Sequence, residues 1–259
     1  MIRLKSEDDI RRLKVGGHIL AEILRELEKY CQENYDKDFF NTLSIDQKCE
    51  ELLAQHKAEA AFKNYSPAPR IIFPASICVS VNDEIVHGIP GSKKLNEGDI
   101  VSLDFGVIYD NLFTDSATSF IIGKAKNDVD EKLLKVTRDA LYCGIDKALA
   151  GNRIGDIGHA IEEYIYSQSN FGIVRDYCGH GVGFSVHEDP SIPNYGKRNK
   201  GELLKNGMVI AIEPMIMEGD EDVFVDDNDW TVKTCDGKKA AHFEHTIAIT
   251  KDGPVILTE

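Results

Sequence analysis

The chain has 259 residues, of which 42% are hydrophobic and 29% are charged, and 44 acidic against 30 basic side chains give a net charge of −14. This composition excludes a disordered tail, a collagen-like fibre and a disulfide-stapled miniprotein. The negative charge repels phosphate backbones and argues against DNA binding. No run approaches the roughly 18 uninterrupted apolar residues of a membrane helix, and the N-terminus has no apolar signal region, so we expect a cytoplasmic protein. Six cysteines without a Cys-x-x-Cys pair argue against a zinc finger and against disulfides.

The hydrophobic spacing of the first half predicts two helices followed by strands. Residues 6–31 have apolar side chains at helical spacing and begin with Ser6, a residue type that caps helices. Two consecutive glycines inside this helix, Gly16 and Gly17, predict close packing against another element. Beyond it we expect a second helix and then strands, over residues 45–63 and then 77–81, 99–108 and 113–122.

The same order starts again in the second half. We expect helices over residues 129–149 and 155–169, followed by strands over 173–178, 208–217 and 243–250. Two helices followed by strands, twice over, predict an α+β fold with pseudo-two-fold symmetry, in which helices back an antiparallel sheet. No linker separates the halves, so residues 1–259 are expected to form a single domain.

Three carboxylates lie inside or at the ends of apolar strands. Asp104 stands in Ile-Val-Ser-Leu-Asp-Phe-Gly-Val-Ile, Glu213 ends Met-Val-Ile-Ala-Ile-Glu, and Glu244 opens Glu-His-Thr-Ile-Ala-Ile. Desolvating one unpaired carboxylate costs several kcal/mol, comparable to the net stability of a domain. These residues therefore need partners or a cation.

Asp115 joins this group if the strands around it form a hairpin that turns at Asp110-Asn111. Residue 106 then faces Asp115, and Asp104 lies on the same face as a diagonal neighbour, at about 7–8 Å between Cα atoms. Two carboxylates at that separation can converge on one or two metal ions. The alternative interpretation is that Asp115 is a solvated turn residue.

Three histidines accompany these acids. His180 lies in the glycine-rich segment Gly-His-Gly-Val-Gly, which is expected to be a loop, His187 follows in Val-His-Glu-Asp-Pro, and His87 stands in Val-His-Gly-Ile-Pro. Imidazole nitrogen is a common metal ligand and proton carrier. Four of the other histidines are expected to be structural hydrogen-bonding residues: His18, His56, His159 and His242.

These segments together resemble those of type I methionine aminopeptidases. The likeness rests on Asp104 and Asp115 with ten residues between them, Cys-Gly-His-Gly-Val-Gly around His180, Ile-Glu-Pro-Met around Glu213 and Phe-Glu-His-Thr around Glu244. It covers nearly the whole chain. It implies the pita-bread fold, an α+β domain with internal two-fold symmetry, which agrees with the doubled pattern.

The resemblance implies a two-metal site held by Asp104, Asp115, His180, Glu213 and Glu244. Four carboxylates would neutralise two divalent cations, and an oxygen-rich donor set favours cobalt, manganese or iron(II) over structural zinc. The implied reaction is hydrolysis of the first peptide bond of nascent proteins that start with methionine and a small second residue. This chain's own Ile2 is bulky, so Met1 is expected to be retained.

The family also implies roles for residues around the metal ions. Glu213 would carry the proton from the attacking water to the leaving amine, and His87 and His187 would orient the peptide and stabilise the oxyanion. The walls of the methionine slot are expected to be Cys78, Phe73 and Trp230.

Two departures from many relatives are visible near this slot. Val186 precedes His187 where many relatives have a larger hydrophobic residue, and the segment 64–72 is expected to lack an aromatic pocket residue.

Partners follow from the same resemblance. A transient ribosome contact would use the basic residues Lys197-Arg198 with Lys200, or Lys93-Lys94. Residues 218–229 carry seven acidic side chains that ribosomal RNA would repel, and they are expected to form a solvated hairpin. A monomer is expected.

Two alternatives stay open. The first is a prolidase or aminopeptidase P, which usually has an added N-terminal domain. The second is a non-catalytic peptide-binding module on the same fold, which would lose metal ligands.

Overall fold

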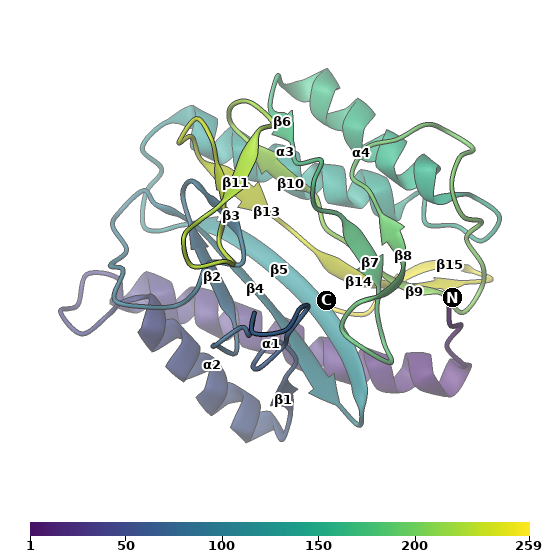
Figure 1. Ribbon diagram of the computed structural model, residues 1–259, viewed down its shortest axis with the longest axis horizontal. Coiled ribbons are helices and arrows are strands. Elements are labelled where there is room, and N and C mark those ends of the chain that lie inside the picture. The colour runs from purple at the N-terminus through teal and green to yellow at the C-terminus, as the bar shows by residue number, and fades with distance from the viewer.

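The computed structural model describes residues 1–259, and the chain follows the predicted order of two helices and then strands, twice. In Figure 1, α1 and α2 lie along one side of the molecule and α3 and α4 along the other, with strands between them. The first half consists of α1 (Glu7–Asn34), α2 (Thr42–His56), β1 (Glu59–Ala60), β2 (Cys78–Val81), β3 (Glu84–Val86), β4 (Ile100–Tyr109) and β5 (Leu112–Ile121). The second half consists of α3 (Asp128–Ile145), α4 (Ile154–Gln168), β6 (Gly172–Ile173), β7 (Gly179–Gly181), β8 (Glu188–Ile192), β9 (Val209–Ile212), β10 (Met215–Met217), β11 (Val223–Val225), β12 (Val232–Thr234), β13 (Ala240–His242), β14 (His245–Thr250) and β15 (Gly253–Ile256).

The two N-terminal helices begin at side-chain caps. Ser6 and Asp9 form a reciprocal capping box at the start of α1, and Asn41 caps α2. The prediction for α2 was wrong at its C-terminal end, because Lys57 takes a left-handed conformation with φ of 55° and stops the helix at His56. The chain then turns into β1 instead of continuing as a helix to residue 63.

The predicted β-hairpin of the first half is confirmed. Strands β4 and β5 pair antiparallel with Tyr109 opposite Leu112 and Gly106 opposite Asp115. The two turn residues, Asp110 and Asn111, have positive φ of 50° and 60°, the geometry of a tight two-residue hairpin. In the same sheet, β2 pairs with the other edge of β4 and sets Cys78 opposite Asp104.

The second half is divided into shorter strands than the sequence predicts. The expected strand 208–217 splits into β9 and β10 at Glu213-Pro214, where proline has no N–H to donate to a ladder. The expected strand 173–178 is limited to β6, and the expected strand 243–250 begins at His245. Strands β15, β14, β9, β7 and β8 form one five-stranded antiparallel sheet.

The two halves meet directly between β5 and the start of β14. Glu244 donates its backbone N–H to the Ala117 carbonyl at 3.0 Å, and the Thr246 hydroxyl donates to the Asp115 carbonyl at 2.7 Å. Each half has its own hydrophobic core, one among α1, α2, β2, β4 and β5 and one among α3, α4, β9 and β14. The two sheets therefore abut along the line where the predicted acidic residues lie.

The glycine pair in α1 lies where the helix approaches other backbone. A Cβ on Gly17 would overlap the carbonyl oxygen of Leu257, and one on Gly16 would lie 3.2 Å from the Tyr109 Cβ. The predicted close packing is confirmed. None of the helices is long and apolar enough to cross a membrane.

Candidate metal centre

A cavity of about 350 Å³ lies over the junction of the two halves. Its lining includes all five acidic and imidazole side chains that the family resemblance assigned to metal binding. Asp104 comes from β4 and Asp115 from β5, while His180 comes from β7, Glu213 from the break between β9 and β10, and Glu244 from the residue before β14. Each half therefore contributes part of one polar floor.

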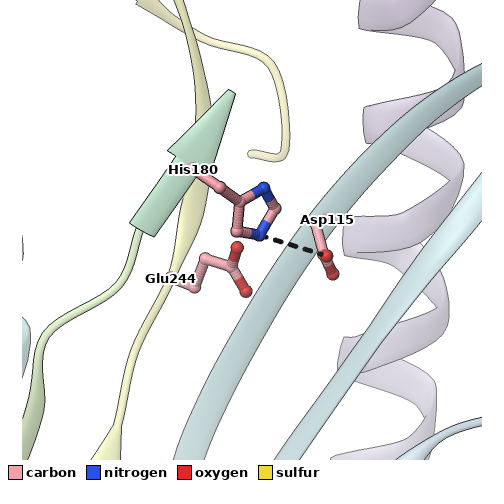
Figure 2. Close-up of side chains that lie close together, drawn as sticks. All are labelled: Asp115, His180 and Glu244. Atoms are coloured by element: carbon pink, nitrogen blue, oxygen red, sulfur yellow. Dashed lines mark ion pairs between the residues drawn. The ribbon is translucent and has the colours of Figure 1, made fainter. Parts of the chain in front are cut away.

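Three of these side chains point toward one another from three separate segments, as Figure 2 shows. One ligand atom each of Asp115, His180 and Glu244 lie within 4.8 Å of one another. The His180 Nε2 atom is 3.9 Å from Asp115 Oδ2 and 3.5 Å from Glu213 Oε1. Asp115 is a buried strand residue, so the interpretation of it as a solvated turn residue is wrong.

Backbone contacts fix the orientation of these side chains. The Asp115 N–H donates to the Thr246 hydroxyl at 2.9 Å, and the Ser116 hydroxyl donates to the Glu244 carbonyl at 2.6 Å. His180 lies on a strand and not in the expected loop. Its Nδ1 atom is 2.9 Å from the Gly181 carbonyl, so Nδ1 carries the hydrogen and Nε2 presents a lone pair to the carboxylates.

The electrostatics of the floor require a cation. Burial raises the pKa of Asp104 to about 7 and that of Glu213 to about 8, and burial together with neighbouring carboxylates raises the pKa of Asp115 and Glu244 well above its usual range. One oxygen each of Asp104, Asp115 and Glu244 is buried without a hydrogen-bond donor. Four carboxylates, three of them with an oxygen that has no hydrogen-bond donor, and one imidazole fit the oxygen-rich donor set of divalent metal ions.

Two further histidines lie beside this floor. His87 is held with φ of 59°, and its ring packs edge-on against Tyr177 and Trp230 at 5.8 and 6.1 Å between ring centroids. The His187 ring lies 4.3 Å from that of His180. Burial lowers the pKa of His87 to about 4 and also lowers that of His187, so both rings are neutral hydrogen-bond donors at pH 7.

The rest of the cavity is apolar and aromatic. Phe73, Cys78 and Trp230 all lie on its wall, and the Phe73 and Trp230 rings meet edge to face at 5.1 Å. Tyr65 also lies on this wall, 5.1 Å from the His187 ring, so the expectation that residues 64–72 lack an aromatic pocket residue is wrong. Val186 instead packs into the larger core and does not line the cavity.

Sequence reasoning missed three residues near the floor. Tyr65 and Tyr177 line the cavity from loops whose path no periodicity predicts. His242 was expected to be a structural histidine, yet neither of its ring nitrogens has a hydrogen-bond partner, and its Nε2 is 3.6 Å from Glu213 Oε2. Its place two residues before Glu244 was the available signal.

Known proteins resemble this chain over its full length. The model of metallopeptidase family M24 matches residues 11–251. A methionine aminopeptidase of Clostridium acetobutylicum is 44% identical, over 100% of this chain and 99% of the relative. Methionine aminopeptidase 1 of Bacillus subtilis is 45% identical over 100% of this chain and 99% of the relative.

Solved structures agree with these matches. A methionine aminopeptidase of Thermotoga maritima superposes with a TM-score of 0.93 at 41% identity, and each chain covers 100% of the other. A prolidase of Pyrococcus horikoshii has a TM-score of 0.75 at 21% identity, and this chain covers 63% of it, so that likeness shows the shared pita-bread fold alone. The chain belongs to metallopeptidase family M24, in the branch of the methionine aminopeptidases.

Proposed function

We propose that residues 1–259 form a single catalytic domain that removes the N-terminal methionine from nascent proteins whose second residue is small. The observation that carries this proposal is the convergence of three buried carboxylates, the partly exposed Glu213 carboxylate and one imidazole at the floor of a cavity with apolar walls. The ionised form of such a floor needs cations to balance its charge, and such walls suit an apolar side chain. The family membership supports both parts.

In this proposal, two divalent metal ions are held by Asp104, Asp115, His180, Glu213 and Glu244. Four carboxylate charges balance the charge of two dications, and cobalt, manganese and iron(II) suit this mixture of oxygen and imidazole donors. When bound, the ions would polarise the substrate carbonyl and lower the pKa of the attacking water. The free α-amino group of the substrate also reaches this acidic floor, which restricts cleavage to the first peptide bond.

The protein's own side chains move the protons. Glu213 accepts the proton of the attacking water and passes it to the leaving amine. His87 and His187 are neutral donors that orient the peptide and stabilise the developing oxyanion.

The apolar wall selects the first side chain. Phe73, Cys78 and Trp230 surround the space beside the carboxylates, and burial raises the pKa of Cys78 so that its thiol stays neutral. Polarizable thioether sulfur packs well against sulfur and aromatic edges. The preference for a small second side chain rests on the membership of the methionine aminopeptidase family.

We further propose a transient ribosome contact by a monomeric, cytoplasmic protein. Of the basic residues considered, Lys94, Lys197 and Lys200 form no ion pair, whereas Lys93 pairs with Glu84 and Arg198 with Glu163, and Lys94 donates to the Asp38 carbonyl. A lysine without a carboxylate partner can contact an RNA phosphate without breaking an ion pair within the protein. The acidic segment 218–229 contains the exposed hairpin strand β11 and would be repelled by RNA.

The test measures methionine release from Met-Ala-Ser and Met-Leu-Ser peptides by chelator-treated and by manganese- or cobalt-loaded protein. We expect release from Met-Ala-Ser only, and only with metal. Cleavage of neither peptide with any metal would favour a peptide-binding module. Cleavage of X-Pro peptides in their place would favour a prolidase activity.

A further inference from the structure

The His242 side chain is the least satisfied polar group near the cavity floor. The residue is 1% exposed, and neither Nδ1 nor Nε2 has a hydrogen-bond partner. A buried polar group left unpaired costs about 1–3 kcal/mol. The interpretation of His242 as a structural hydrogen-bonding residue is therefore wrong, because neither ring nitrogen forms a hydrogen bond.

The backbone of His242 is nevertheless fixed rigidly. Its N–H donates to the Ser119 hydroxyl at 2.9 Å, and its carbonyl accepts from the same hydroxyl at 2.7 Å. In the ladder between β10 and β13, His242 lies opposite Met215, two residues beyond Glu213. The ring is thus held in one place, with Nε2 3.6 Å from Glu213 Oε2.

The Glu213 carboxylate lies between two imidazoles. Oε1 is 3.5 Å from His180 Nε2, and Oε2 is 3.6 Å from His242 Nε2. The only hydrogen bond to this residue's acceptors goes to its backbone carbonyl, from the Asn194 side chain at 2.9 Å. If His180 Nε2 offers its lone pair to a metal ion, as the proposed function requires, it cannot donate to Glu213. His242 is then the one imidazole left to donate to this carboxylate.

We infer that His242 is a positioning residue that donates its Nε2–H to Glu213 Oε2 and so directs Oε1 toward the metal ions. The distance of 3.6 Å is slightly longer than a hydrogen bond, and a small rotation of the Glu213 side chain closes it. Such contacts often tighten only when the site is loaded. This inference rests on the proposed function, since it assigns the partner that orients its proton carrier.

A positioning role differs from a structural one in what its loss affects. Carboxylates that bind metal are themselves held by outer hydrogen bonds, and loss of such a partner costs about 10–100-fold in metal affinity or activity. Loss of a merely structural ring would lower thermal stability and leave metal binding unchanged. Metal affinity is therefore the deciding measurement.

The experiment compares His242→Gln with His242→Asn. The amide nitrogen of glutamine reaches the position of Nε2, whereas that of asparagine reaches only that of Nδ1. Both variants keep a polar side chain of lower volume, so a difference between them reports the donor position and not packing. His159→Gln on α4 is the matched control, because its Nε2 is also near a carboxylate, 3.8 Å from Glu163 Oε2, outside the cavity.

The readouts are manganese affinity and stoichiometry by calorimetry, and kcat and KM for Met-Ala-Ser. We expect His242→Asn to bind the more weakly held of the two manganese ions with an affinity about 10–100-fold lower. Its kcat should fall by a similar factor, with KM nearly unchanged. His242→Gln and His159→Gln should stay within about threefold of the unmodified protein. The inference is overturned if the asparagine variant binds manganese as well as the glutamine variant, or if both match the unmodified protein.

The unmodified protein separates this inference from the proposed function. If it binds manganese but releases no methionine, the proposed function fails, and the affinity difference between the two His242 variants still supports or overturns the positioning role. If it binds no divalent ion at all, both fail together.

Discussion

Removing the metal ions should make the stability of this protein fall steeply with pH. Without a cation, the floor of the cavity holds four carboxyl groups, three of them buried, whose pKa values are all raised, to about 7 for Asp104 and about 8 for Glu213. A carboxyl group with a raised folded pKa stays protonated in the folded state at pH values where it is ionised in the unfolded chain. Its contribution to stability is full below about pH 4 and is lost as pH rises through the folded pKa.

The window from pH 6.5 to pH 8 isolates this effect. Below pH 6.5, buried neutral histidines have the opposite effect on stability. His180, whose pKa is lowered to about 3, makes the free energy of unfolding rise with pH in that range. From pH 6.5 to pH 8, the contribution to the free energy of unfolding falls by about 1 kcal/mol for Asp104 and by about 2 kcal/mol for Glu213. For a chain of this size, a total of about 2–3 kcal/mol corresponds to a melting temperature lower by roughly 5–10 °C.

The assay is thermal unfolding at pH 6.5, 7, 7.5 and 8, with chelator and with manganese. The chelated protein should lose roughly 5–10 °C across the window, whereas the loaded protein should change little because the ions compensate the ionised carboxylates. Chelated Asp104→Asn, with one fewer buried acid, should be more stable than the chelated unmodified protein at pH 8. A chelated protein whose melting temperature is flat or rises from pH 6.5 to pH 8 would refute the reasoning.

Three other substitutions test separate parts of the argument. Glu213→Ala should lower kcat for Met-Ala-Ser by about 10²–10⁴-fold and reduce the manganese bound per chain, measured by metal analysis; near-normal turnover would contradict the proton-carrying role. Trp230→Ala should raise KM for Met-Ala-Ser by about tenfold with a smaller change in kcat, because it removes apolar contact with the methionine side chain; an unchanged KM would remove Trp230 from the slot. Gly17→Ala should destabilise the fold by about 1–3 kcal/mol, since the new Cβ overlaps the Leu257 carbonyl oxygen, and urea unfolding that shows no loss would contradict the close packing.

Residues close in sequence were predictable because their geometry depends on local rules. The positions of Asp104 and Asp115 follow from the two-residue period of strands and from a turn, at Asp110-Asn111, whose residue types favour positive φ. The start of α1 at Ser6 follows from capping chemistry in the same way.

Element ends were less predictable where a single residue decides them. Lys57 ends α2 by adopting a left-handed conformation that nothing in its side chain favours. Pro214 divides an apolar run that otherwise has the composition of one long strand. Periodicity describes the average of a segment, so it does not locate such an interruption.

The convergence of the two halves belongs to the tertiary structure. His180, Glu213 and Glu244 reach Asp115 only because β5 and the residue before β14 are joined at Ala117 and Glu244, 127 positions apart in the chain. Hydrophobic patterns identify which face of a strand is buried, but not which distant strand covers it. For these three residues, the resemblance to a family supplied what spacing did not.

The sequence by itself determined the acid-bearing strands, the doubled order of helices and strands, and a local pair of carboxylates that needs a cation. Only the tertiary structure decided that the Tyr65 ring lies on the cavity wall and that His242 faces Glu213 with no other partner. The physical reason is that residue type determines the chemistry of a side chain, whereas the packing of segments that are remote in the chain determines its partners.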